Sequence, residues 1–520
     1  MKQLKDLLEK LEYEGEIGDG TRPVAALVSD SRKLCRDCLF VAIKGENFDG
    51  HSAIKAAAEN GAAAVLAQYA DEETRECLKK SGTALLVTED TRRALALCSA
   101  AWFDYPAEKL CMIGITGTKG KSSSACMIKT ALDRLGIPCG LIGSIEIDDG
   151  KNHIPSKNTT PESIELQEIL SEMVTNGLKA VVMEVSSQGL KMHRTDGILF
   201  DVGVFTNLSP DHIGPREHED FADYLHCKSL LFRQCVTACV NADDPHTEEV
   251  LAGNSCKKIV RFGFSENADR RAEAIELAIQ GGHPGVAFSA EGFGKAERYW
   301  FPFPGRFSAS NILAAMSALE AASERLGFSF SAREAAEAIT HTMIKGRIEL
   351  LPVSEEYSMM IDYAHNAMAL ESLLKTLREY GKGRLVTLFG CGGDRARSRR
   401  FEMGEASGRL SDLSIVTSDN PRSEDPMAII EDILSTMKKT GGEYVTIPDR
   451  KEAIEYAIAH ALPGDIIILA GKGHEDYQEI AGVKHHMDER ELVYDILRKR
   501  GDQKAAERML ARYPELGALA

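Results

Sequence analysis

The sequence lacks the features of a membrane-embedded or secreted chain. No apolar run among its 520 residues approaches the roughly 20 residues that a membrane-spanning helix needs. The first 15 residues interleave Lys, Asp and Glu with Leu, so we expect no secretory signal there. The 12 cysteines are scattered, and only Cys35 and Cys38 form a C-x-x-C pair. This usage favours reduced thiols in a cytoplasmic protein over a disulfide framework or a metal site.

Positive charge is also scarce. The 62 Lys and Arg residues face 79 Asp and Glu residues, which gives a formal net charge of −17. Proteins that wrap nucleic acid gain affinity by neutralising phosphates over a broad surface, so this balance argues against such binding. A local pocket of basic side chains and backbone N–H groups can still bind an anionic small molecule. We therefore expect small-molecule partners, with no nucleic acid and no membrane.

Internal repeats and low-complexity tracts are absent as well, and the composition is that of a globular protein. Short β-rich runs that end in Gly or polar clusters alternate with amphipathic stretches, which predicts an α/β fold with three domains. We predict a small N-terminal α/β domain, a central P-loop ATPase-like parallel sheet and a C-terminal Rossmann-like doubly wound sheet. Their predicted bounds are 1–108, 109–345 and 346–501, followed by a tail at 502–520 that is a peripheral helix or a frayed end.

The most informative motif is TGTKGKSSS, which joins a strand pattern ending at Ile115 to a helical pattern. Glycines in such a loop let backbone N–H groups turn toward a phosphate, Lys121 supplies a point charge, and Ser122 can ligate magnesium. The strict pattern GxxxxGK[ST] is not met, because Ile115 stands where its first Gly belongs. The alternative is a Gly-rich turn with a solvated lysine. We predict ATP contacts at Gly117, Thr118, Lys119, Gly120, Lys121, Ser122 and Ser123.

Two later strand patterns end in possible metal ligands. Glu184 closes the run AVVMEVSS after apolar positions, and a buried carboxylate needs a cation or hydrogen-bond partner. Asp211 and His212 follow the next run, and parallel strands deliver their carboxyl ends to one edge of a sheet. The convergence predicts a magnesium site. Alone, His212 would be interpreted as a capping or core histidine, and Lys228 as a surface lysine.

From about Val28 to about Arg490 these motifs resemble the Mur ligases of peptidoglycan synthesis, in particular those that add the third amino acid to UDP-N-acetylmuramoyl-L-alanyl-D-glutamate. The loop TGTKGKSS resembles their ATP loop, which accounts for the missing first Gly. The resemblance implies an ATP- and Mg²⁺-dependent acid–amino-acid ligase that forms an acyl phosphate and releases ADP and phosphate. It implies a cytoplasmic location, and we expect a monomer.

The resemblance also assigns roles to residues at matching positions. It implies that the DSR and DGH segments, which begin at Asp30 and Asp49, belong to the domain that holds the UDP end. It implies catalytic roles for Lys121, Glu184, His212 and Lys228, with Ser122, Glu184, His212 and a carbamylated Lys228 as metal ligands. It places the UDP-sugar-peptide contacts at Ser31, Thr159, Thr160, Ser186 and Arg194. It places further ATP contacts at Asn311, Arg347, Asp362 and His365. It places the amino-acid contacts at Arg395, Asp419, Asn420, Pro421, Arg422, Gly471 and Glu475.

The identity of the added amino acid depends on the DNPR motif. The second amino-acid centre of meso-diaminopimelate needs an Arg for its carboxylate and an acid for its ammonium, and Arg422 and Glu475 suit those tasks. L-Lysine would leave Arg422 unpaired, so the motif favours meso-diaminopimelate. Alone, DNPR would be interpreted as an ordinary Asn-Pro turn. Gln188 and Met192 depart from the family pattern near the peptide.

Two other functions stay open. One is a ligase resembling folylpolyglutamate synthetase, against which the DSR, DGH and DNPR motifs argue. The other is a non-catalytic nucleotide switch, in which ATP only closes the domains. A requirement for an amino-acid acceptor in ATP turnover distinguishes the ligases from the switch.

Overall fold

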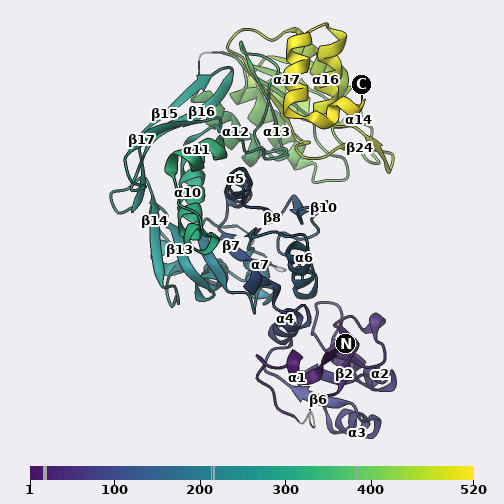
Figure 1. Cartoon of the computed structure of the whole chain (residues 1–520). Coiled ribbons are helices and arrows are strands. Elements are labelled where there is room, and N and C mark those ends of the chain that lie inside the picture. The colour runs from purple at the N-terminus through teal and green to yellow at the C-terminus, as the bar shows by residue number, and fades with distance from the viewer. Residues whose placement is uncertain (16–19, 212, 215–216, 382, 520) are drawn as a thin grey trace. The chain divides into compact units, whose positions relative to one another are not determined.

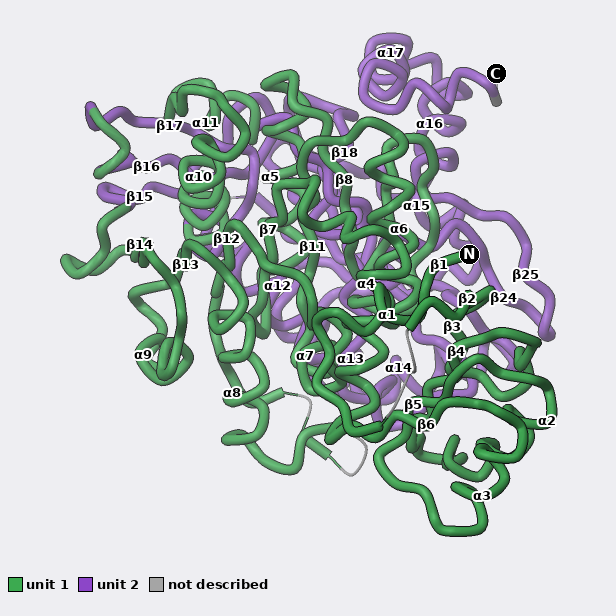
Figure 2. Tube along the Cα trace, turned by 60° about the horizontal axis from the view of Figure 1, so that its bottom comes forward, with its two compact units in different colours: residues 1–271, 292–294, 310–339 green, residues 272–291, 295–309, 340–520 purple. Residues whose placement is uncertain are grey.

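The computed structural model describes residues 1–15, 20–211, 213–214, 217–381 and 383–519. Contacts between residues divide the chain into two compact units, drawn in green and purple in Figure 2. Unit 1 comprises residues 1–271, 292–294 and 310–339. Unit 2 comprises residues 272–291, 295–309 and 340–520. The three-domain division at 108 and 345 stays a prediction.

The N-terminal part of unit 1 is built on a parallel sheet in the order β3-β4-β5-β6. The apolar runs ALV, CLFV and AVLA form the strands β3, β4 and β5, and residues 54–59 form helix α2. Strand β6 adds a fourth, and β4 and β5 are buried along their whole length. The elements (Figure 1) are β1 Lys2–Gln3, α1 Leu4–Leu7, β2 Pro23–Val24, β3 Ala26–Val28, β4 Cys38–Val41, α2 Ile54–Glu59, β5 Ala64–Ala67, α3 Glu72–Ser81, β6 Ala84–Val87 and α4 Thr91–Trp102.

The central sheet has the strand order β10-β9-β8-β11-β7-β12-β13-β14-β15-β16-β17. The predicted parallel sheet is present from β8 to β15, and antiparallel strands extend it at both edges, so the whole sheet is mixed. Its elements begin with β7 Cys111–Thr116, α5 Lys121–Arg134, β8 Cys139–Ile142, β9 Glu146–Asp148, β10 His153–Pro155, α6 Ser163–Thr175, β11 Ala180–Glu184, α7 Ser187–Lys191, β12 Phe200–Phe205 and α8 Phe221–Ser229. They continue with β13 Cys235–Asn241, α9 Thr247–Val250, β14 Lys258–Gly263, β15 Arg270–Gln280, β16 His283–Glu291, β17 Glu297–Phe301, α10 Arg306–Leu326 and α11 Ala332–Thr340.

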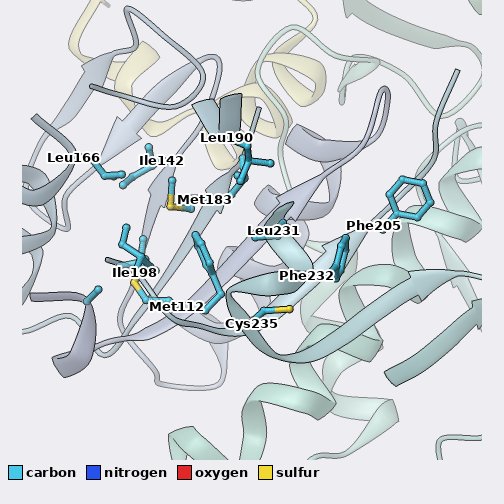
Figure 3. Packing of buried hydrophobic residues seen from close by; sticks show 14 of the residues in the cluster. Met112, Ile142, Leu166, Met183, Leu190, Ile198, Phe205, Leu231, Phe232 and Cys235 are labelled. Atoms are coloured by element: carbon cyan, nitrogen blue, oxygen red, sulfur yellow. The ribbon is translucent and has the colours of Figure 1, made fainter. Parts of the chain in front are cut away.

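The core of this part lies between the parallel strands and the helices that follow them. Met112 of β7 and Met183 of β11 pack in one cluster with Leu231 and Phe232, which follow α8 (Figure 3). Every residue of β7 and β11 is buried, as expected for parallel strands covered on both faces. Each fully buried Leu, Met or Phe contributes about 1.5–3 kcal/mol. The rigid strands therefore hold the loops at their carboxyl ends in fixed positions.

The C-terminal part of unit 2 holds a sheet in the order β18-β19-β23-β20-β21-β22, parallel except for the edge strand β18. The apolar runs SMMID, LVTLF, LSIV and IIILA form the strands β19, β20, β21 and β23. The elements are β18 Glu349–Leu351, β19 Ser358–Asp362, α12 Ala367–Arg378, β20 Leu385–Phe389, α13 Ser398–Leu410, β21 Leu413–Val416, α14 Pro426–Thr440, β22 Tyr444–Thr446, α15 Arg450–Ala459, β23 Ile466–Ala470, β24 Tyr477–Ile480, β25 Val483–His486, α16 Glu489–Lys499 and α17 Gln503–Arg512.

The tail is a packed helix, not a frayed end. Ala505, Ala506 and Met509 of α17 are buried in the same cluster as β19 and β23, together with Tyr513. The described residues contain no helix long and apolar enough to cross a membrane.

Candidate functional site

The Gly-rich loop joins β7 to α5 in unit 1. Gly117 has φ +147° and Gly120 has φ +87°, conformations that L side chains rarely adopt. A Cβ atom at Gly117 would lie 2.0 Å from Thr206 Oγ1, and one at Gly120 would lie 2.4 Å from Asn311 Oδ1. Asn311 of α10 therefore lies against the loop. Glycine is required at both positions, because φ is positive there and because a Cβ atom would collide with Thr206 or Asn311.

The loop is held by the end of β12. Asn207 accepts a hydrogen bond from the Lys119 N–H at 3.0 Å and donates from Nδ2 to the Lys119 carbonyl at 2.9 Å. The Thr118 N–H donates to the Asn207 carbonyl at 2.8 Å. Thr206 Oγ1 also donates to the Lys119 carbonyl, at 2.7 Å. These hydrogen bonds hold the Gly-rich loop against the end of β12, with Ser122 and Ser123 in the first turn of α5.

Two lysines converge on the loop. Lys121 Nζ donates to the carbonyls of Gly117 and Thr118 at 2.9 and 3.1 Å, and Lys228 Nζ donates to the carbonyl of Gly117 at 2.9 Å. Lys228 is only 2% exposed. Burial, together with the nearby charge of Lys121, lowers the pKa of Lys228 well below its ordinary value. The amine of Lys228 is therefore more readily deprotonated than that of a surface lysine.

Glu184 closes β11 beside the Gly-rich loop. Its Oε1 accepts hydrogen bonds from Ser122 Oγ and the Ser144 N–H, both at 2.9 Å, and its Oε2 accepts from Ser144 Oγ at 3.1 Å. Ser144 Oγ also lies 3.0 Å from Thr159 Oγ1. Carboxylate and hydroxyl oxygens are the protein ligands that Mg²⁺ prefers, so this donor set fits a magnesium ion. His212 lies outside the described residues.

The peptide-side residues form a second group next to Glu184. Thr160 Oγ1 donates to the Glu184 carbonyl at 3.0 Å and lies 3.1 Å from Ser186 Oγ, which caps α7. Arg194 donates to the Thr160 carbonyl at 2.9 Å and pairs with Glu162 at 2.5 Å. The structure therefore brings four predicted peptide contacts and the predicted metal ligand Glu184 to one edge of the sheet.

A cleft of about 690 Å³ lies beside Ser31 in unit 1. It is lined by the DSR segment, by Phe48 and Arg92 of the N-terminal part, and by Glu162 and Ile164 of the central part. Asp30 pairs with Arg32 at 2.8 Å, and this pairing lowers the pKa of Asp30 to about 2. The cleft has an arginine-bearing wall where the resemblance expects the UDP end.

The His51 side chain of the DGH segment is held by contacts within the N-terminal part of the chain. Its Nδ1 lies 2.7 Å from Asp49 Oδ1, its Nε2 accepts the Gln68 N–H at 3.0 Å, and its ring stacks on Tyr69. Both ring nitrogens are therefore engaged within the fold.

The predicted ATP contacts of unit 2 lie at the end of β19 or just after it, or precede β18. Asp362 accepts the N–H groups of Ile348 and Ala364, each at 2.8 Å, and burial raises its pKa. The Arg347 guanidinium lies 5.4 Å from the Tyr363 ring, and His365 Nδ1 lies 2.8 Å from the Tyr363 carbonyl. Asp362 thus holds the backbone directly after Arg347 and directly before His365.

The predicted amino-acid contacts gather at the ends of β20, β21 and β23. Arg422, at φ +53°, donates to the Gly393 carbonyl at 2.6 Å and to Glu479 at 3.3 Å. Asn420 donates to Glu475 at 2.8 Å. A Cβ atom at Gly471 would lie 2.7 Å from Asp419 Oδ2, so the two chain segments touch. Pro421 is buried in this turn, whereas Arg395 is exposed.

Sequence reasoning missed Lys472, Ser144 and Tyr224. Lys472 is fully buried and donates to Asn420 Oδ1 at 3.0 Å and to Glu475 at 2.9 Å. Tyr224 places its hydroxyl 3.1 Å from Thr118 Oγ1 and its ring under the Lys228 ammonium. The lysine inside GKGHE was a visible signal, since a charge directly after a buried strand needs a partner. Nothing in the local sequence indicated Ser144.

The chain matches one family along most of its length. The family described as "Mur ligase family, catalytic domain" matches residues 23–102, "Mur ligase middle domain" matches residues 115–319, and "Mur ligase, glutamate ligase domain" matches residues 346–473.

Curated proteins and solved structures are similar over nearly the whole chain. A UDP-N-acetylmuramoyl-L-alanyl-D-glutamate–2,6-diaminopimelate ligase of Caldanaerobacter subterraneus subsp. tengcongensis is 40% identical over 496 residues, 95% of this chain and 99% of the relative. A protein of the same description from Clostridium acetobutylicum is 37% identical and covers 96% of this chain and 99% of its own. A solved structure of such a ligase superposes with a TM-score of 0.73 at 27% identity, covering 96% and 99% of the two chains.

Proposed function

Because the chain belongs to the Mur ligase family, whose members use ATP, we propose that it joins meso-diaminopimelate to the D-glutamate of UDP-N-acetylmuramoyl-L-alanyl-D-glutamate. The observation that carries the proposal is the full-length similarity to ligases described by that reaction. It is supported by Arg422 after β21 and Glu475 after β23, the two strands on either side of β20. ADP and phosphate are the other products. Because ATP and UDP-linked precursors are cytoplasmic, we place the reaction there.

We assign phosphoryl transfer to residues of unit 1 and amino-acid binding to residues of unit 2. In unit 1, Lys121 and the N–H groups of the loop bind the triphosphate, while the D-glutamate carboxylate attacks the γ-phosphoryl group and forms an acyl phosphate. Thr160, Ser186 and Arg194 orient the peptide, and Asn311 supports the nucleotide loop. The amine of the amino acid bound in unit 2 then attacks the acyl carbon, and phosphate leaves. Catalysis comes mainly from positioning and charge neutralisation.

Magnesium has a fitting set of oxygen donors. Ser122 and Glu184 would hold the ion, with His212 and a carbamylated Lys228 as further ligands. Bound Mg²⁺ would neutralise phosphate charge during transfer. The lowered pKa of Lys228 supports carbamylation, because only the neutral amine adds CO₂, losing a proton to give a carbamate.

The choice between meso-diaminopimelate and L-lysine rests on Arg422. Its guanidinium suits the distal carboxylate, and Glu475 suits the ammonium of the same centre. Arg422 pairs with Glu479 and Glu475 pairs with Lys472, so a bound amino acid would share or exchange those partners. L-Lysine addition is the alternative within the same reaction.

The test is phosphate release with ATP, Mg²⁺ and the UDP-linked dipeptide, with either meso-diaminopimelate or L-lysine, and with the product mass determined. Release and a mass gain with meso-diaminopimelate alone support the proposal. Preference for L-lysine keeps the ligase and overturns the assignment of Arg422. No release with either amino acid favours the folate ligase or the nucleotide switch.

Arg422→Asn sharpens the test, because Asn tolerates a positive φ while removing the guanidinium. We expect KM for meso-diaminopimelate to rise by about tenfold or more, since a charge-assisted hydrogen bond is worth roughly 1.5–3 kcal/mol. Arg409→Asn, on the exposed side of α13, is the matched control and should leave KM unchanged.

A further inference from the structure

A relay of hydrogen bonds joins helices α7 and α8 outside the contacts proposed for substrates. Ser187 Oγ lies 2.9 Å from His218 Nε2, and His218 Nδ1 lies 3.0 Å from Asp223 Oδ2. His218 is fully buried and Ser187 is 4% exposed. The order Ser–His–Asp is that of acyl-transfer triads, in which the acid orients the imidazole.

The environment of Asp223 fixes the direction of these bonds. Burial acts to raise the pKa of Asp223, but hydrogen bonds from Lys191, the Glu219 N–H and His218 hold that pKa well below its usual value. The ionised carboxylate accepts, so His218 Nδ1 donates. Burial lowers the pKa of His218, and the neutral ring then accepts at Nε2 from the Ser187 hydroxyl. With the Ser187 hydroxyl donating to Nε2 and Nδ1–H donating to Asp223, both hydrogen bonds of the relay are satisfied.

The burial and the charges exclude two other functions for the relay. A nucleophilic serine must reach its substrate, and Ser187 is closed off by the fold. A metal ion on His218, Asp223 and Cys227, whose ligand atoms lie within 4.8 Å of one another, would compete with Lys191. The Lys191 ammonium already lies 2.6 Å from Asp223 Oδ2, where a cation would bind. The relay is therefore neither a hydrolase triad nor a metal site.

The relay connects the two halves of the phosphate site. Helix α7 begins three residues after Glu184, the carboxylate that holds Ser122. Helix α8 carries Asp223 at one end and Lys228 at the other. Between them, Tyr224 packs edge-on against the His218 ring at 5.1 Å and reaches Thr118 of the loop. His218 is thus the middle member of the relay and also packs against the Tyr224 ring, over which the Lys228 ammonium lies.

We propose that His218 is a positioning residue, which fixes α8 against α7 so that Lys228 stays on the Gly117 carbonyl while Glu184 stays on Ser122. This inference rests on the proposed function, because its readout is ligase turnover. Its effect is on the phosphoryl-transfer step. The amino-acid contacts belong to unit 2 and are built from other residues.

The test compares kcat and KM for His218→Phe and Ser187→Ala in the full chain. Phe keeps the ring beside Tyr224 and removes both hydrogen bonds, and Ala removes only the serine end. We expect kcat to fall by about tenfold or more in each, because a shift of ~1 Å in a catalytic group can cost up to 10²-fold. KM for the amino acid should stay within about twofold of the wild type. The double variant should lose little more than His218→Phe alone, since both substitutions break one relay.

His246→Phe is the matched control. His246 also lies against α8, with its ring 5.0 Å from Phe221, but outside the relay, so kcat should not change. If His218→Phe fails to fold, Ser187→Ala decides the question. Wild-type kcat in a folded Ser187→Ala, or losses that multiply in the double variant, overturn the proposal. An inactive wild type overturns the proposed function instead, so the two failures are distinguishable.

Discussion

The ammonium group of Lys472 lies 2.9 Å from Oε2 of Glu475, and the lysine is fully buried. Lys472 also donates to Asn420 Oδ1 at 3.0 Å and lies 3.9 Å from Asp419. One cation therefore balances the acidic side of the proposed amino-acid pocket. It also ties the DNPR turn to the loop after β23.

Lys472→Met should destabilise the protein and weaken amino-acid binding together. Removing one partner of a buried ion pair leaves an uncompensated charge, which costs about 3–5 kcal/mol. We expect the free energy of unfolding in urea to fall by about this amount, and KM for meso-diaminopimelate to rise. Lys484→Met is the control, because Lys484 is exposed on β25 over the Tyr477 ring. Equal stability of the two variants would contradict the role given to Lys472.

The sequence predicted the local structure of those parts of the candidate site that are contiguous in the chain. The Gly-rich loop is contiguous with its strand and helix, so glycine spacing and the apolar runs sufficed to predict this strand-loop-helix arrangement. Glu184 could be placed because a carboxylate closing a buried strand must lie at the sheet edge. The parallel middle of the central sheet followed from the same continuous apolar runs.

The remainder depends on contacts between distant segments. Strands β15 and β17 are only partly buried and carry charges, so they lack the apolar run that marks a strand here. Lys472 binds Asn420 across 52 residues, and local periodicity does not record that pairing. The sequence left a peripheral helix and a frayed end as alternatives for the tail, because the contact that holds it, from Tyr513 to Glu349, spans 164 residues.

Gly117→Ala should abolish nucleotide binding. The new Cβ would collide with Thr206 Oγ1, in addition to the strain of φ +147°. Gly136→Ala is a matched control at the other end of α5, with φ +79° and open space around the Cβ position. It should cost only the backbone strain of roughly 1–2 kcal/mol. Calorimetric titration with ATP should detect binding to Gly136→Ala and none to Gly117→Ala; equal affinities would contradict the close approach of Thr206.

His193 should make stability depend on pH. Its hydrogen bond to Asp196 at 3.1 Å, with Asp90 at 3.6 Å, raises the pKa of His193 above its ordinary value of 6.5. A raised pKa stabilises the fold fully below the unfolded value and loses that effect as pH rises through the folded value. The gap in Tm between wild type and His193→Asn should therefore be larger near pH ~5.5 than near pH ~8.5.

His193 has φ +55°, and Asn is the replacement because it adopts a positive φ more readily than most residues. In an Asp196→Asn background the same comparison should show a weaker pH dependence, since the principal partner is gone. A gap that grows toward alkaline pH would contradict the sign of the shift.

Tyr513→Phe tests whether the tail supports the loop after β23, which carries Glu475, a proposed amino-acid contact. The buried Tyr513 hydroxyl donates to Glu349 Oε1 at 2.8 Å, and burial raises the pKa of this tyrosine. Glu349 also accepts the Gly346 N–H and pairs with Arg490, which in turn donates to the Gly473 carbonyl at 3.2 Å. Removing the hydroxyl leaves a buried acceptor short of a partner, which costs about 1–3 kcal/mol.

We therefore expect a lower Tm for Tyr513→Phe, together with a modest rise in KM for the amino acid, because Gly473 belongs to the loop that carries Lys472 and Glu475. Tyr494→Phe is the matched control. Tyr494 packs in the same core. Among the residues that the structure describes, its hydroxyl has no hydrogen-bond partner. A Tm as high as that of Tyr494→Phe would show that Glu349 does not need the tail, whereas a lower Tm with unchanged KM would confine the effect to stability.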